Sequence, residues 1–191
     1  MDTISISGNS VALDADGLGN NVTGATFTLT ANDAGDSLAH KITVLNNTAN
    51  DHSGKTLALV GTDANGRPQT ETLTGPAGAA TVTSEKYYLS LTSITPSATI
   101  GADTFDIGWA AASVSPHKYI LHSGDIGFGC RVVSGTPTYT VQQTYDDIVW
   151  FDHATVASET TSQEGTYLFP IRAVRLTWAA AGEVTFTGLQ E

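Results

Sequence analysis

The sequence predicts an all-β protein that consists of two β-sandwich modules in tandem. Short segments that alternate polar and apolar residues recur at intervals of roughly ten residues, separated by Gly, Pro, Asn and Asp, as in sandwiches and barrels. Threonine is abundant and suits pleated strands, and no long segment has the apolar period of a helix. We expect jelly-roll or immunoglobulin-like modules over residues 1–113 and 114–191, with the small, polar residues 110–116 as a linker.

The first module is expected to open with a strand in which Ile4 and Ile6 face one side. A polar, glycine-rich patch over residues 14–24 and a loop over residues 46–54 are expected between strands. Asn65-Gly66 favours a tight turn, so the segments on either side of it should pair as a hairpin. Further strands are expected at residues 25–31, 38–45, 55–61, 68–74, 80–83, 86–91 and 104–109.

The second module is expected to repeat this pattern of short strands and turns. Its clearest feature is a terminal hairpin, in which residues 171–178 and 183–187 pair across a turn at residues 179–182. The other strands are expected at residues 118–121, 130–133, 138–144, 148–151 and 166–169.

Composition limits the partners that this chain can bind. The net charge is −11, from 8 basic and 19 acidic residues, which argues against nucleic-acid binding because that requires clustered Lys and Arg. Either the acidity keeps the protein soluble, or an acidic surface docks on a basic partner lattice. No apolar stretch has the length of a bilayer span, and the first ten residues lack the features of a secretion signal. We therefore expect synthesis in the cytoplasm and no membrane partner.

Residues that could bind metal are few and poorly spaced. Asp14 and Asp16 have the spacing that opens a calcium loop, but Leu18 and Ala25 stand where ligands are needed, so a plain turn is expected. The five histidines lack the spacing of a zinc site and are expected at turns or on the surface. They are His40, His52, His117, His122 and His153.

Candidate catalytic residues are equally weak. Cys130 is the single cysteine, so no intrachain disulfide can form, and a buried, inert thiol is expected. Asp146 and Asp147 are adjacent rather than separated across a cleft, and should end a strand and cap a turn. The prediction is a non-enzymatic protein without catalytic residues, metal or cofactor.

Tryptophans offer one further alternative. Trp109, Trp150 and Trp178, with Phe151, could form the stacking platform of a glycan-binding β-sandwich. Each tryptophan stands at the end of an expected strand beside apolar residues, which favours packing in a core or an interface.

Four segments resemble parts of small virion structural proteins of tailed bacteriophages. These are GTDANGRPQTETLTGP and TSEKYYLSLTSIT in the first half, and FGCRVVSGTPTYTVQQTYDD and YLFPIRAVRLTWAAAGEVTFTGLQ in the second. The resemblance implies a capsid decoration or cement protein that binds the lattice of the major capsid protein, or alternatively a tail, tail-fibre adaptor or head-fibre component. A homo-oligomer within the virion is then expected, with a trimer as one option, because capsid sites are symmetric.

Two arginines of the FPIRAVRL segment are candidate contacts. Arg172 and Arg175 have an odd separation, which places them on opposite faces of a strand. We expect Arg172 on the packed side, either over Trp178 or paired with Asp146 or Asp147, and Arg175 at an intersubunit or partner contact. The alternative is two solvated charges on an edge strand. Arg172, Arg175 and Trp178 together form the predicted oligomer or partner contact.

Overall fold

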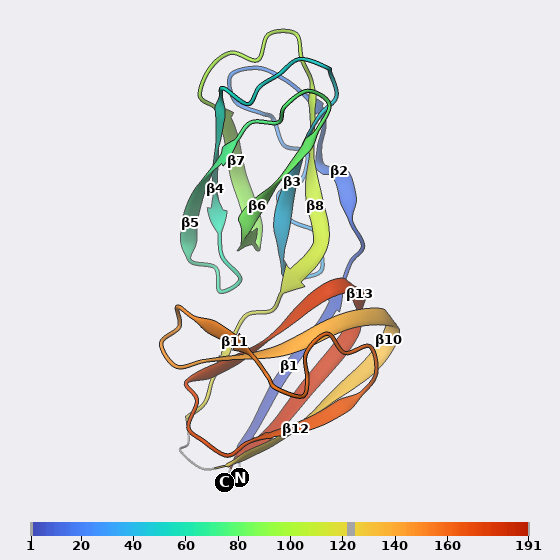
Figure 1. Cartoon of the computed structure of the whole chain (residues 1–191), viewed down its shortest axis with the longest axis vertical. Coiled ribbons are helices and arrows are strands. Elements are labelled where there is room, and N and C mark those ends of the chain that lie inside the picture. Colours follow the sequence, from blue (N-terminus) through green and yellow to red (C-terminus); the bar gives the residue numbers. More distant parts are fainter. Residues whose placement is uncertain (1, 122–124, 191) are drawn as a thin grey trace. The chain divides into compact units, whose positions relative to one another are not determined.

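The computed structural model describes residues 2–121 and 125–190, and every regular element within them is a β-strand (Figure 1). This confirms the all-β class. The strands form two compact units: residues 12–111, here called the central unit, and residues 1–11 with residues 112–191, here called the terminal unit. This division departs from the expected module over residues 1–113, because β1 (Asp2–Ser10) pairs along its whole length with β13 (Ala173–Gln190).

The central unit contains two antiparallel sheets that share one core. One sheet has the strand order β2-β8-β3-β6 and the other has the order β5-β4-β7. Val44 and Phe105 from the first sheet and Leu59 and Ile94 from the second are fully buried in the same apolar cluster. The strands are β2 (Asp14–Val22), β3 (Ala39–Asn46), β4 (Thr56–Thr62), β5 (Pro68–Thr74), β6 (Thr81–Tyr88), β7 (Ser90–Pro96) and β8 (Phe105–Val114).

The expected hairpin around Asn65-Gly66 is confirmed as β4 and β5. Gly66 has a φ of 77°, and the backbone N–H of Asp63 donates to the Arg67 carbonyl at 2.9 Å. The Asp63 carboxylate also accepts hydrogen bonds from the backbone N–H groups of Asn65 and Arg67. The turn is therefore fixed by local chemistry that the sequence displays.

Two expectations for the beginning of the central unit are wrong. Residues 14–22 form strand β2, whereas residues 25–31 form no strand. The glycines of β2 permit close approach: a Cβ added to Gly17 would lie 2.5 Å from the Trp109 ring. Phe27 is buried although its segment is irregular, because its backbone N–H donates to the Ile94 carbonyl.

The terminal unit is organised around two long strands, β10 (Ile126–Thr144) and β13. They pair with each other over most of their length, and we call this pair the ribbon. β1 adds to the other side of β13, while β11 and β12 add to the outer edge of β10. The remaining strands are β9 (Lys118–Tyr119), β11 (Trp150–Asp152) and β12 (Gln163–Tyr167).

The ribbon overturns the expected terminal hairpin, because residues 179–182 continue β13 instead of forming a turn. The small residues at positions 179–182 mark a β-bulge in the ribbon and not a turn. Between Val132 and Tyr139, β10 advances one residue more than β13 does between Val184 and Trp178. Gly135 and Gly182 lie opposite each other there with φ values of 75° and 148°, which non-glycine residues rarely adopt.

The expected linker over residues 110–116 contains the boundary between the two units, which falls between residues 111 and 112. Residues 110–114 end strand β8, and Ser113 and Ser115 are almost fully buried in the terminal unit. Ser113 shares a hydrogen bond with Ser10, and the Ser115 hydroxyl accepts a hydrogen bond from the Leu176 backbone N–H. Small polar side chains here allow close packing rather than flexibility.

Substitution of Gly61 is a test of the packing in the core of the central unit. A Cβ added to this β4 residue would lie 2.1 Å from the Ser90 carbonyl oxygen and 3.1 Å from the Leu91 Cα. Because these atoms are backbone, Gly61→Ala should lower the free energy of unfolding by about 2 kcal/mol or more, as measured by chemical denaturation. Gly54→Ala is the control, since a Cβ there meets nothing within 4 Å. Equal stability of the two variants would contradict this packing.

Candidate functional site

The terminal unit carries an exposed cluster of apolar side chains, here called the apolar tip. It consists of Tyr145, Ile148 and Val149 from the β10–β11 connection, Phe151 from β11, and Phe169 from the segment after β12. Ile148 is 81% exposed and Tyr145 is 52% exposed. The Tyr145 ring lies 6.0 Å from the ring of Phe151 and 6.4 Å from that of Phe169. Exposed aromatic side chains that lie this close together, beside further exposed apolar residues in sequence, are typical of interaction sites.

Hydrogen bonds fix the conformation of the loop that bears the tip. The Thr144 hydroxyl accepts from the backbone N–H groups of Asp146 and Asp147, and the Asp146 carboxylate accepts from those of Ile148 and Val149. The backbone N–H bonds from Val149 and Ile148 hold the pKa of Asp146 below its ordinary value of 3.8. Asp146 therefore caps the turn, as expected. Because these hydrogen bonds already fix the loop, the exposed Ile148 side chain does not need the loop to become ordered on binding.

Asp147 anchors the other side of this loop. Its φ is 64°, and its carboxylate, whose side chain is only 15% exposed, receives Arg172 Nε at 2.7 Å and the Tyr119 hydroxyl at 3.2 Å. The Arg172 guanidinium also lies 5.7 Å from the centre of the Tyr119 ring. Arg172 thus pairs with one of the two expected carboxylates, but its side chain is 55% exposed and not buried over Trp178.

The other two predicted contact residues lie in different environments. Arg175 is half-buried: its guanidinium carbon lies 4.0 Å from the centre of the Trp150 ring, and its Nε donates to Gln142 at 2.8 Å. Trp178 is 2% exposed and belongs to the core of the terminal unit. The structure therefore does not gather the three residues on one open surface, although Arg172 stands beside the loop of the apolar tip.

The tryptophans also do not assemble into a stacking platform. Trp109 packs against the core of the central unit and donates its indole N–H to the Ala12 carbonyl at 3.0 Å. Trp150 belongs to the terminal unit, where Arg175 covers its ring and His117 lies 5.6 Å away. Sugar stacking on tryptophan finds no support in this arrangement.

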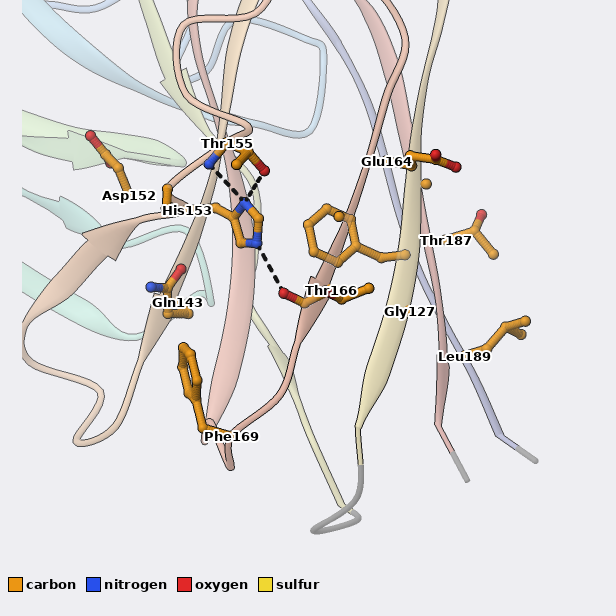
Figure 2. Close-up of a pocket in the computed structure, with 14 residues that line it drawn as sticks. Gly127, Gln143, Asp152, His153, Thr155, Glu164, Thr166, Phe169, Thr187 and Leu189 are labelled. Carbon is orange, nitrogen blue, oxygen red and sulfur yellow. Dashed lines mark hydrogen bonds between the residues drawn. The ribbon is translucent and has the colours of Figure 1, made fainter.

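A second feature of the terminal unit is an open hollow of about 880 Å³ beside β12 (Figure 2). Gln143, Asp152, His153 and Phe169 line one side of it in this view, and strand residues around Gly127 line the other. His153 is 7% exposed and packs edge-on against the rings of Phe128 and Tyr167. Its Nδ1 accepts from the Thr155 backbone N–H at 3.3 Å, so Nε2 carries the hydrogen that faces the Thr166 carbonyl.

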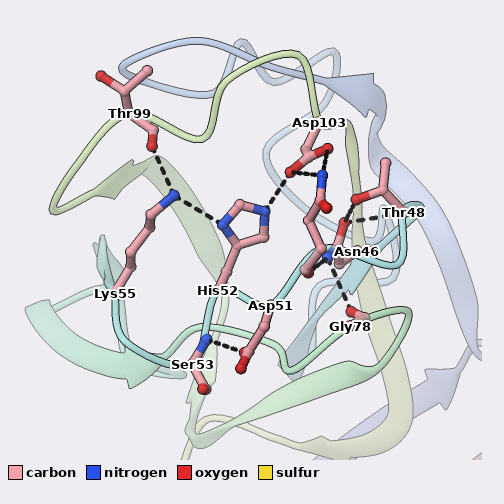
Figure 3. Close-up of polar contacts among 10 residues, drawn as sticks. Asn46, Thr48, Asp51, His52, Ser53, Lys55, Gly78, Thr99 and Asp103 are labelled. Atoms are coloured by element: carbon pink, nitrogen blue, oxygen red, sulfur yellow. Dashed lines mark hydrogen bonds and ion pairs between the residues drawn. The ribbon is translucent and has the colours of Figure 1, made fainter.

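The central unit buries a separate group of ionisable side chains (Figure 3). His52 lies between Lys55 and Asp103, with Nδ1 3.0 Å from Lys55 Nζ and Nε2 2.7 Å from the Asp103 carboxylate. Asn50 also donates to Asp103, and this bond is the main reason why the pKa of that carboxyl is lowered. This chain of hydrogen bonds ends at the Lys55 ammonium group, which donates to the Thr99 carbonyl at 2.7 Å. It joins two loops and has the form of a structural network.

His40 is buried in the same unit with a different pattern of hydrogen bonds. Its Nδ1 lies 3.0 Å from the Ala110 carbonyl oxygen and its Nε2 lies 2.8 Å from the Asp36 carboxylate. Both partners are hydrogen-bond acceptors, so the two contacts hold the ring from opposite sides. His40, His52 and His153 are thus buried, against the expectation of turn or surface positions, while His122 lies outside the described residues.

The remaining chemical candidates are inert in this fold. Cys130 is buried, as expected, and burial raises the pKa of its thiol to about 12. Within residues 2–121 and 125–190, no group of three or more His, Cys, Asp or Glu side chains is placed to hold a metal ion. In that same part of the chain, no helix is long and apolar enough to cross a membrane.

Comparisons with known proteins do not assign the chain to a family. No protein-family model matches it, and no curated protein sequence matches it either.

Sequence reasoning missed the apolar tip, the hollow and the buried histidine networks. The Tyr145–Phe151 segment contains four of the five tip residues, and its apolar residues directly after Asp146-Asp147 were the available signal. No comparable signal exists for the pairing of His52 with Asp103, because these residues are far apart in sequence and their contact depends on the fold.

The pairing of Arg175 with Trp150 leads to a stability prediction. Arg175→Ala should lower the free energy of unfolding by about 1–2 kcal/mol, because it removes a partly buried cation–π contact and a hydrogen bond. Arg175→Lys should recover only part of this loss, since Lys lacks the planar group that stacks. Chemical denaturation measures both changes. An equal effect of Arg175→Ala in a Trp150→Leu background would contradict the proposed contact.

The lowered pKa of Asp103 leads to a pH prediction. Because the folded carboxyl has a pKa below the ordinary 3.8, the charged form stabilises the fold above about pH 4, and this contribution is lost as the pH falls through the folded pKa. Asp103→Asn should therefore lower the melting temperature at pH 7 and flatten its decline in acid. Glu85→Gln, which removes an exposed charge, is the control. A decline in acid as steep as that of the parent would contradict this role.

Proposed function

We propose that this chain is a non-enzymatic structural protein of a tailed-bacteriophage virion, specifically a capsid decoration or cement protein that binds the lattice of the major capsid protein. The observation that carries the proposal is the apolar tip, a cluster of exposed aromatic and aliphatic side chains on a loop of fixed conformation. The resemblance of four segments to small virion proteins supports the same class. The protein would be made in the host cytoplasm and would act in the virion.

The physical properties of the tip suit a lattice contact. Buried apolar and aromatic anchors supply most of the binding energy in protein interfaces, and a loop that is already ordered loses little entropy on binding. Many copies that bind a repeating lattice gain avidity when they are linked. We include in the proposal a symmetric homo-oligomer, with a trimer as one option, because capsid sites are themselves symmetric.

The proposal also covers the finer description of the fold. We infer that both units are β-sandwich modules of the jelly-roll or immunoglobulin-like kind. The shared core between two sheets supports this for the central unit, and the curved ribbon with its one-sided core supports it for the terminal unit.

A tail, tail-fibre adaptor or head-fibre component is the second candidate. The division of the chain into two compact units favours it, since one unit could dock while the other presents a surface. Copy number separates the candidates: decoration requires hundreds of copies per particle, whereas a tail component requires few. Quantitative mass spectrometry of purified virions measures this number, and a low count would exclude the decoration role.

The role of the tip is tested by binding to capsids that lack this protein. Ile148→Asp should weaken binding at least about tenfold, because a charge would enter the apolar contact. Leu13→Asp is the control, because it changes an exposed apolar residue of the central unit. Binding should also persist at high salt, since apolar contacts are not screened. Unchanged binding of Ile148→Asp, or loss of parent binding in salt, would contradict a tip-mediated contact.

A further inference from the structure

The hollow of the terminal unit has the features of a ligand site. Its volume of about 880 Å³ is within the usual range of small-molecule pockets, about 300–1,000 Å³. Gly127 and Gly129 form part of its lining on the exposed face of β10, and a Cβ added to either would meet nothing within 4 Å. Two glycines on one face of a strand leave space that side chains would otherwise occupy.

One polar side chain in the lining lacks a full set of partners. Gln143 is only 8% exposed, and the oxygen of its side-chain amide accepts a hydrogen bond from the Tyr167 hydroxyl at 3.1 Å. The amide nitrogen has no hydrogen-bond partner within the described part of the chain. If the amide were turned around, the oxygen would lack one instead. The amide nitrogen is not enclosed by protein atoms, so it is available to donate a hydrogen bond to a ligand in the hollow.

The other lining groups define the chemistry of that ligand. Thr155, Thr166 and Thr187 bring hydroxyl groups, and Asp152 and Glu164 bring carboxylates that accept hydrogen bonds. Phe169 is 48% exposed and offers part of its ring. The ligand should therefore present many hydroxyl groups and at least one apolar face.

The charges of the lining residues argue against most other classes of ligand. The lining contains two carboxylates and neither Lys nor Arg. Phosphates, nucleic acids and acidic sugars would be repelled and would find no cation to pair with. An uncharged compound with hydroxyl groups and an apolar face remains.

We infer that the hollow lined by Gly127, Gly129, Gln143 and Phe169 binds a neutral oligosaccharide. The Gln143 amide and the two carboxylates hydrogen-bond sugar hydroxyls, one pyranose face packs on the Phe169 ring, and the glycines allow the sugar to lie close to the backbone of β10. This activity is additional to lattice binding, and of the five residues of the apolar tip only Phe169 also lines the hollow.

Nuclear magnetic resonance of the 15N-labelled full chain tests the inference directly. Maltotriose, cellotriose and tri-N-acetylchitotriose are titrated separately at millimolar concentrations, with trigalacturonic acid as the anionic comparison. At least one neutral trisaccharide should cause saturable shifts that include the Gln143 side-chain amide, assigned by its loss in Gln143→Leu. No saturable shift with any neutral trisaccharide, or equal binding of the acid, would overturn the inference.

Matched variants locate the site without disturbing the core. Gly129→Gln places a side chain in the hollow and should weaken binding at least about tenfold. Gly54→Gln adds the same side chain in the central unit, where it also meets nothing within 4 Å, and should bind as the parent does. Ile148→Asp should retain sugar binding and Gly129→Gln should retain capsid binding, so the two proposals fail separately. Parent-like sugar affinity of Gly129→Gln would overturn the assignment to this hollow.

Discussion

The bulged pairing of β10 with β13 is the constraint on which the terminal unit depends. Every other strand of that unit pairs with one of these two, so their register decides which side chains face the core. Before the bulge, the even-numbered residues Ile126, Phe128 and Cys130 are buried; after it, the odd-numbered residues Tyr139 and Val141 are buried. One extra residue in β10 produces this exchange, and glycine on both strands makes it sterically possible.

The same exchange places the two candidate sites. Gly127 and Gly129 precede the bulge and are exposed, whereas Gln143 follows it and is largely buried, and all three line the hollow. β10 then ends at Thr144, whose hydroxyl begins the hydrogen bonds that order the tip loop. The hollow and the apolar tip are therefore both consequences of how one strand is paired.

Local patterns in the sequence were sufficient to predict the all-β fold class. They were also sufficient to predict the turns and strands that neighbouring residues determine. The Asn65-Gly66 hairpin, the alternation of Ile4 and Ile6 in β1, and the capping role of Asp146 were all predictable, because each depends on neighbouring residues. The terminal hairpin failed because glycine at position 182 marks a bulge as readily as a turn. Only the partner strand distinguishes these two cases, and that partner is distant in sequence.

Burial of polar residues was the least predictable property, for a related reason. His40 and His52 each depend on a distant partner to be tolerated in the interior, namely the Ala110 carbonyl and the Asp103 carboxylate. A buried polar group costs free energy unless it is paired, so its position is decided by partners that the fold brings together. The candidate sites share this dependence: Gln143 meets Tyr167, and Tyr145 meets Phe169, only once β10 and β12 are paired.

The strong negative charge and the exposed apolar tip are compatible because the carboxylates beside the tip are used within the fold. Asp146 is hydrogen-bonded by backbone N–H groups, and Asp147 is bound by Arg172 and Tyr119, so both carboxylates have partners within the fold. The other acidic residues give the chain its net charge of −11, which disfavours random association between copies. An apolar surface of fixed shape on a strongly acidic protein is thus protected against indiscriminate contacts and remains available to a complementary surface.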